Sequence, residues 1–271
     1  MTLKRPLPFG LWQSPVTAAS TGQRLRLEDV QWDADGSLLW LEGHSDRNKI
    51  ISRLPAGKML DLTGELSARG RVGYGGGDFI VQNGLVVFAG SDGRLYSTRT
   101  EGGDPRPITP DGGASASPGI SPDGRRVLFI FTDGTEDSLA LVDIDGLENP
   151  LHLARRADFF MQPVWHPDGS RIAWIEWDHP NMPWDGSRLM LGSLAGSSPA
   201  FENQILIAGD SKTPLLQPLF SPDGRWLSYI APNGDWEKLV LFQLETGFSK
   251  TLIAGEKLLL STPAWVQGMR F

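Results

Sequence analysis

The residues whose types and spacing could do chemistry lie in one decapeptide, WDHPNMPWDG, at positions 177–186. Its histidine stands among carboxylates, so Asp178, His179 and Asp185 could bind a metal ion or act as a general acid and base. The segment has only one histidine, however, and the chain has no nucleophile elbow that a general base could activate. Both observations favour a second interpretation, in which the segment is not catalytic.

In that interpretation the decapeptide is a stiff loop between two strands. Trp177 and Trp184 would pack it onto its sheet, two prolines would stiffen it, and Asp178 and Asp185 would accept hydrogen bonds from backbone amides. We therefore predict no catalytic residue and no metal site. The remaining alternative is a loop that faces a partner domain or a peptide.

Other motifs with a chemical resemblance have simpler explanations. The glycine-rich GYGGGDF at 73–79 lacks the preceding strand and following helix of a phosphate-binding loop. Close approach of backbone segments near the central axis of the fold explains these glycines better. DADG at 33–36 and DIDG at 143–146 lack the downstream glutamate of a calcium loop and are expected to be hairpin turns. We predict no cofactor. The isolated histidines are expected to be surface or hydrogen-bonded residues: His44, His152 and His166.

Composition narrows the class of protein. The 271 residues include no cysteine, which removes disulfides, zinc–thiolate sites and thiol nucleophiles. The net charge of −7 argues against a nucleic-acid or anionic-membrane partner, since both attract clustered lysine and arginine. The N-terminal residues contain no signal-like apolar run, and no window approaches the roughly 18 apolar residues of a membrane span. A cytoplasmic location is expected.

A repeated turn organises the chain. SPDG occurs at 121–124 and 221–224, HPDG at 166–169, and the looser WDADG at 32–36. Proline presets the first corner, aspartate bonds its own backbone, and glycine accepts positive φ. Apolar strands such as RRVLFIF, SRIAWIEW and RWLSYIA follow these turns, and a second and often a third strand come next. The pattern predicts antiparallel hairpins and almost no helix.

Four-stranded units that recur with the same turn indicate an all-β fold, a β-propeller of antiparallel blades. Five units are expected, at 30–63, 74–110, 118–158, 163–210 and 218–257, and TPAWVQGMRF at the end starts a sixth. The domains are then an N-terminal segment, 1–29, which supplies an edge strand or a domain contact, and a propeller, 30–271. Either residues 2–28 complete the last blade with 262–271, or blades are missing and an open edge invites self-association.

Specific motifs resemble a known family. LWQSPVTA at 11–18, VQWDADG at 30–36, RVGYGGGDF at 71–79, the stretch from DFFMQP to PWDG at 158–186, and PAWVQGMRF at 263–271 occur in this order. Together they resemble the N-terminal propeller of the prolyl oligopeptidase family of serine peptidases, in the branch of acylaminoacyl and dipeptidyl peptidases. Some relatives have an acidic residue where Gly73 stands, which weakens the transfer of substrate contacts to this chain.

The resemblance implies a partner as well as a fold. Full-length relatives carry an α/β-hydrolase domain with a Ser-Asp-His triad, but no serine in this chain has the Gly-x-Ser-x-Gly context of a nucleophile elbow. In the relatives the propeller gates peptide access to the active site. The resemblance favours the following residues as contacts to a peptide or partner: Trp12, Ser14, Tyr74, Gly75, Gly76, Asp178, His179, Asn181, Met182, Trp184 and Asp185.

Three functions follow, in order of preference. The first is a non-catalytic propeller that filters peptides or mediates protein interaction, with an α/β-hydrolase domain as partner in a longer product. The second is a stand-alone TolB-like propeller that binds a protein. The third is an independent propeller enzyme with its site at the 177–186 loop.

Overall fold

The computed structural model describes residues 8, 15–16, 25–73, 75–146, 149–194, 200–261 and 266–268. Every regular element in these residues is a β-strand, and the strands form five four-stranded antiparallel sheets. The predicted all-β propeller is therefore confirmed. None of the described segments is a helix long and apolar enough to cross a bilayer.

Each sheet is one blade, formed by four consecutive strands. The strands are, in blade 1, β1 (Arg26–Trp32), β2 (Leu38–Gly43), β3 (Asn48–Arg53) and β4 (Met59–Asp61); in blade 2, β5 (Phe79–Gln82), β6 (Leu85–Ala89), β7 (Leu95–Arg99) and β8 (Arg106–Pro107); in blade 3, β9 (Ala114–Ile120), β10 (Arg126–Thr132), β11 (Asp137–Asp143) and β12 (Leu151–Ala154); in blade 4, β13 (Phe159–Trp165), β14 (Arg171–Trp177), β15 (Arg188–Leu194) and β16 (Phe201–Gly209); and in blade 5, β17 (Leu216–Phe220), β18 (Trp226–Asn233), β19 (Trp236–Gln243) and β20 (Ser249–Ala254).

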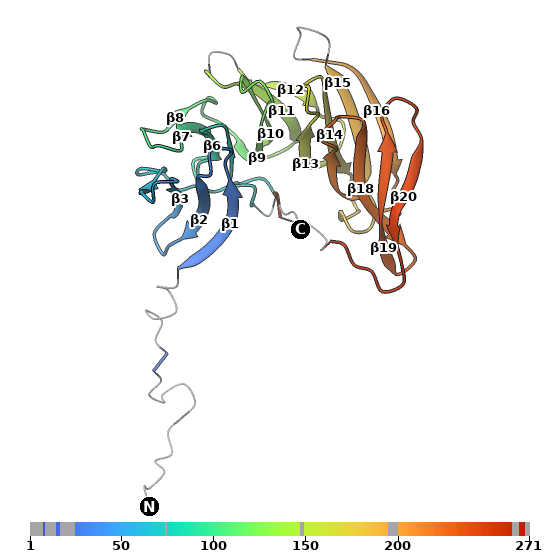
Figure 1. Cartoon of the computed structure of the whole chain (residues 1–271), viewed down its shortest axis with the longest axis horizontal. Coiled ribbons are helices and arrows are strands. Elements are labelled where there is room, and N and C mark those ends of the chain that lie inside the picture. The colour runs from blue at the N-terminus through green and yellow to red at the C-terminus, as the bar shows by residue number, and fades with distance from the viewer. Residues whose placement is uncertain are drawn as a thin grey trace, which may run out of the picture.

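The blades form an open arc, with blade 1 at one end and blade 5 at the other (Figure 1). The first strand of each blade lies innermost and contacts the first strand of the next blade. Because strands alternate in direction, the Pro-Asp-Gly-type turns share one side of the arc, which we call the turn face. The β14–β15 loop and the connections from one blade to the next share the other side, which we call the loop face.

The apolar core lies between blades. Four clusters of buried residues occupy the four junctions between successive blades. Strand β14 is buried at every position after its first, and β10 has four consecutive buried residues, as continuous apolar runs covered on both faces should. Strand β2 instead alternates half-buried and buried positions, because the outward face of blade 1 has no neighbour among the described residues.

The turns connect the blades as well as the strands. On the turn face, Asp33 accepts hydrogen bonds from the backbone N–H groups of Asn83 and Gly84 in blade 2, at 2.7 and 2.6 Å. His166 bonds the carbonyl of Gly224 in blade 5 at 2.7 Å through Nε2. Asp33 and His166 are both 7% exposed, so these bonds are shielded from water. The expected hairpin turns and hydrogen-bonded histidine are thus confirmed.

A second repeat, which the sequence analysis missed, lies in the innermost strands. Ser117, Gln162 and Gln217 each precede a proline, have φ between +52° and +53°, and stand four residues before the first residue of their turn. Each lies at a break in strand register, as expected of a β-bulge that redirects a side chain. In blade 4 the redirected Gln162 Oε1 accepts the backbone N–H of Gln217 in blade 5 at 2.7 Å.

Of the two alternatives for the chain ends, the described residues fit the open edge rather than closure of the ring. Residues 26–28 pair with β2 inside blade 1, so the first sheet begins four residues before the boundary expected at residue 30. Gln267 bridges to Gly76 in the middle of the arc, not to blade 5. The remainder of 2–28 and 262–271 lies mostly outside the described residues.

Candidate functional site on the loop face

The 178–187 loop, between β14 and β15, is held by the hydrogen bonds that its aspartates accept. Asp178 Oδ1 accepts the backbone N–H of Asp158 at 3.1 Å, and Asp185 Oδ2 accepts that of Met182 at 2.9 Å. The carboxylate of Asp178 also pairs with Arg188 at 2.8 Å. The predicted capping role of these aspartates is confirmed.

Aromatic side chains at the start of the loop contact Phe159 of β13. Trp177 is 7% exposed and stacks on Phe159 of β13, with ring centroids 5.2 Å apart. The ring of His179 meets Phe159 edge-on at 4.9 Å and is otherwise exposed. These contacts hold the loop against the first residue of β13, the innermost strand of blade 4.

An apolar pocket of about 140 Å³ opens beside this loop. Most of its lining is aromatic or thioether side chain, and Asp137 adds a carboxyl whose pKa is raised by burial. The pocket is lined by Gly73, Asp137, Phe159, Phe160, Met161, Trp177, His179, Met182, Pro183 and Gln267.

The glycine-rich segment forms the inner border of this pocket. Gly75 accepts a hydrogen bond from the backbone N–H of Gln267 at 2.8 Å, and Gly76 bridges Gln267 in parallel. A Cβ on Gly76 would lie 2.3 Å from Val266 Cγ1, so only glycine allows this approach. The prediction that close backbone contact explains the glycines is confirmed.

Gln267 connects the glycine segment to two further blades. Its Nε2 donates to the carbonyl of Phe160 in blade 4 at 2.9 Å, and its Oε1 accepts from Ser117 in blade 3 at 3.3 Å. With 5% exposure, Gln267 is buried at the centre of the arc. Sequence analysis missed this residue, because nothing in its local pattern indicates contact with positions 107 and 150 residues away.

A second, polar hollow of about 510 Å³ lies on the other side of the glycine segment, toward blades 1 and 2. Here burial raises the pKa of Asp78 to about 6, although the carboxylate accepts the backbone N–H of Gly70 at 2.8 Å. Arg47 pairs with Asp61 at 3.1 Å through one nitrogen, while its buried Nη1 has no hydrogen-bond partner. The glycine segment and residues 266–268 thus separate an apolar pocket from a charged one.

The residues predicted to contact a peptide or partner do not all lie at one site. His179 and Met182 line the apolar pocket, Gly75 and Gly76 border the polar hollow, and Asn181 donates to the carbonyl of Ser211 at 2.7 Å. Trp184 is half-buried and is not among the lining residues. Trp12, Ser14 and Tyr74 lie outside the described residues. Within the described part of the chain, no three histidine, aspartate or glutamate side chains are grouped to hold a metal ion.

Comparisons with known proteins support the fold and the family resemblance. No protein-family model matches the chain, and no curated protein matches it. Among solved structures, a puromycin-hydrolysing peptidase of Mycobacterium tuberculosis superposes with a TM-score of 0.82 and 26% identity, over 98% of this chain and 44% of its own. A structure of puromycin hydrolase gives 0.83 and 26%, over 97% and 44%. The chain resembles the N-terminal propeller of a prolyl oligopeptidase-family peptidase.

This propeller therefore spans less than half the length of the peptidases that it matches. TolB-like propellers share its fold alone. A putative TolB from Agrobacterium tumefaciens has a TM-score of 0.58 at 18% identity, covering 89% of this chain and 82% of its own.

Proposed function

We propose that this propeller is a non-catalytic module whose loop face binds peptides and filters their access to a catalytic domain in a longer product. The apolar pocket carries the proposal. A cavity of about 150 Å³ lined by apolar side chains is large enough for benzene, so the pocket of about 140 Å³ suits one leucine or phenylalanine side chain. The 178–187 loop and Gly73 of the glycine segment contribute to its lining, so both could contact a bound peptide.

The peptide preference gives a direct test. Isothermal titration calorimetry with capped tripeptides Ac-Ala-X-Ala-NH2 should give at least about tenfold tighter binding for leucine or phenylalanine at X than for glycine. Burying such a side chain contributes about 1.5–3 kcal/mol, which covers this difference. Equal affinity for the glycine and leucine peptides would reject the proposal.

Variants connect this preference to the pocket. His179→Ala and Met182→Ala remove lining atoms and should reduce the preference for leucine to less than about threefold. Met59→Ala, an exposed change on β4 of blade 1, is the matched control and should leave the preference intact.

The same proposal predicts no peptide-bond cleavage by this chain. Acyl-peptide and dipeptide chromogenic substrates should show no turnover above buffer. Turnover that a serine-directed inhibitor abolishes would overturn the non-catalytic assignment.

We also propose that the ends of the arc associate with other polypeptide. Leu27, Val30 and Trp32 of β1 are 67, 64 and 69% exposed, and Leu252 and Ile253 of β20 are 55 and 45% exposed. Such apolar strands favour contact with another chain, either a second copy or a partner protein, as in the TolB-like alternative. Light scattering after size exclusion should show a mass that rises with concentration, and the double change Leu27→Ser and Trp32→Ser should reduce it. A constant monomer mass would contradict association with a second copy and leave a different protein as the partner of these edges.

A further inference from the structure

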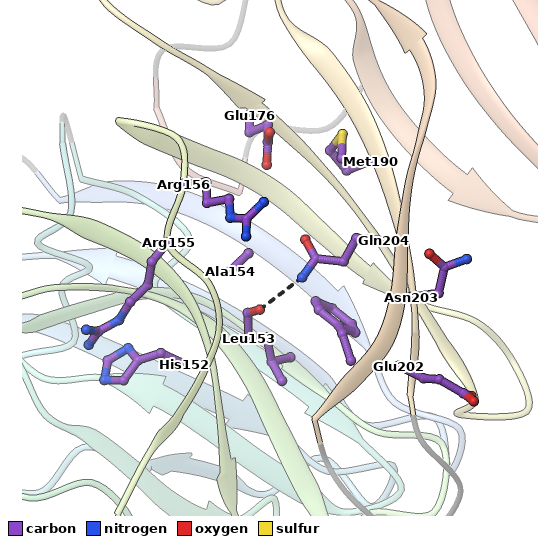
Figure 2. A pocket seen from close by; sticks show the side chains of 11 residues that line it. His152, Leu153, Ala154, Arg155, Arg156, Glu176, Met190, Glu202, Asn203 and Gln204 are labelled. Carbon is purple, nitrogen blue, oxygen red and sulfur yellow. Dashed lines mark hydrogen bonds between the residues drawn. The ribbon is translucent and has the colours of Figure 1, made fainter.

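A third hollow, of about 510 Å³, lies at the outer rim between blades 3 and 4 (Figure 2). It exists because the facing outer strands differ in length: β12 has four residues and β16 has nine. The longer strand extends past its neighbour and leaves a groove that no described segment fills. This volume is typical of small-molecule sites.

The floor of the groove is aromatic. Phe201 of β16 stacks on Trp174 of β14, with centroids 5.3 Å apart and planes 10° from parallel. Gly192 of β15 makes this position available, since a Cβ there would lie 2.4 Å from the Phe201 ring. Trp174 is wholly buried while Phe201 is partly exposed, so a flat apolar surface faces the groove.

One wall carries two consecutive arginines. Arg155 and Arg156 follow β12, are exposed, and form no ion pair or side-chain hydrogen bond with any residue the structure describes. In Figure 2 the side chain of Arg156 extends toward Gln204 and Glu176, while Arg155 lies beside His152. Burial, assisted by Arg155, lowers the pKa of His152 and so favours its neutral ring.

The other wall is polar, and its buried carboxylate already has other hydrogen-bond donors. Gln204 crosses the groove to donate to the carbonyl of Leu153 at 3.4 Å. Glu176 is 8% exposed, and its carboxylate already accepts from Arg188 Nε at 3.2 Å and from Trp174 Nε1 at 2.8 Å. The carboxylate of Glu202 points away from the arginines in Figure 2.

We propose that this groove binds a carboxylate attached to an apolar ring or chain, either as a free small molecule or as the C-terminal residue of a peptide. Unpaired guanidinium groups bind carboxylates with two parallel hydrogen bonds. The Phe201 face would take the apolar body, and the amide of Gln204 would bond its polar substituents. The groove is separate from the apolar pocket on the loop face and does not depend on its function.

The probes are N-acetylphenylalanine and its uncharged analogue, N-acetylphenylalaninamide, in isothermal titration calorimetry. The acid should bind with a Kd at or below about 1 mM, and the amide at least about tenfold more weakly. An acetylated tripeptide ending in a free phenylalanine distinguishes the sources: tighter binding than the single residue indicates a peptide C-terminus, and equal binding indicates a small carboxylate.

Variants assign this binding to the groove. The double change Arg155→Ala and Arg156→Ala removes two exposed side chains and should abolish the difference between acid and amide. Arg53→Ala, an exposed arginine on blade 1, and Met182→Ala in the loop-face pocket should preserve it. No heat from the acid at millimolar concentration, equal binding of acid and amide, or an unchanged double variant would overturn the proposal.

Discussion

The turn face and the loop face of the arc are built from the same strands, yet they differ in what their polar groups do. On the turn face one hydrogen bond or more crosses every junction between blades: Asp33 at the first, Gln82 at the second, Trp165 at the third and His166 at the fourth. The hollows beside the glycine segment lie on the loop face, and their linings do not repeat from blade to blade. The difference indicates that the turn face joins every pair of neighbouring blades by a similar contact, whereas the loop face is joined near its centre by Gln267 and carries the hollows.

The largest effect is expected from Asp33→Ala on the turn face. It leaves the backbone N–H groups of Asn83 and Gly84 without an acceptor in a buried position, which should cost about 3 kcal/mol of unfolding free energy. Urea unfolding measures the loss. Asp235→Ala, on an exposed turn, should stay within about 0.5 kcal/mol of the parent. If Asp33→Ala altered peptide preference as strongly as stability, the two faces would not be independent.

On the loop face, Gly76→Ala should cost about 2 kcal/mol, because the residue has φ +85° and its new Cβ would lie within 2.5 Å of both Val266 and Gln267. Displacement of Gln267 should also weaken the leucine preference of the pocket. Gly57→Ala is the matched control, with φ +87° and no atom within 4 Å, so it carries the strain without the clash. Equal losses in urea unfolding for both variants would show that residues 266–268 do not need the close approach.

A pH-dependent effect is expected at Asp78, beside the polar hollow. Its folded-state pKa of about 6 lies above the ordinary value near 3.9, so the folded state holds its proton more tightly. The stability from this protonation is full below about pH 4 and is lost as the pH rises through about 6. Asp78→Asn keeps an oxygen acceptor for Gly70 and should be about 1–2 kcal/mol more stable than the parent at pH 7.5, with no gain at pH 4. Unfolding curves at both pH values test this, and a gain independent of pH would contradict it.

The smallest change in stability is expected from Asp185→Ala. The lost hydrogen bond to the backbone N–H of Met182 is exposed and should contribute about 0.5 kcal/mol. The loop would lose its local constraint, so peptide affinity should fall about threefold or more even though stability barely changes. Asp185→Asn, which keeps an acceptor oxygen, should restore most of the affinity. A stability loss as large as that of Asp33→Ala would show that the loop is structural.

Much of the fold could be predicted from sequence because its determinants are local. A Pro-Asp-Gly-type turn and the apolar strands around it occupy about 20 residues, and their spacing alone indicates five blades. The caps made by Asp178 and Asp185 involve neighbours in the loop or one adjacent connection, so residue type and position were sufficient. The bulges at Ser117, Gln162 and Gln217 also have a sequence signal. Each is a residue before proline at a fixed distance from the following turn.

The candidate site was predicted only in part, because its lining combines the 178–187 loop with the innermost strand of blade 4 and with three residues from elsewhere in the chain, Gly73, Asp137 and Gln267. His179 and Met182 were expected, whereas Phe159, Asp137 and Gln267 join them only when β13, the β10–β11 hairpin and residues 266–268 converge. The sequence left the choice between a closed ring and an open edge undecided for the same reason. Pairing between strands from the two chain ends depends on tertiary contacts that the local sequence does not reveal. In the structure β1 pairs with β2, its neighbour in the same hairpin.

The sequence by itself determined the blade, since turn chemistry and strand periodicity act over a few residues and repeat five times. Only the tertiary structure decided how the blades are joined and what lies between them. The position of Gln267 at the centre, the ring of Phe201 lying over Gly192 and the open groove beside Arg156 depend on contacts between separate strands or blades. Such contacts leave no periodic trace in the chain, because each is made once, by residues that are neighbours only after folding.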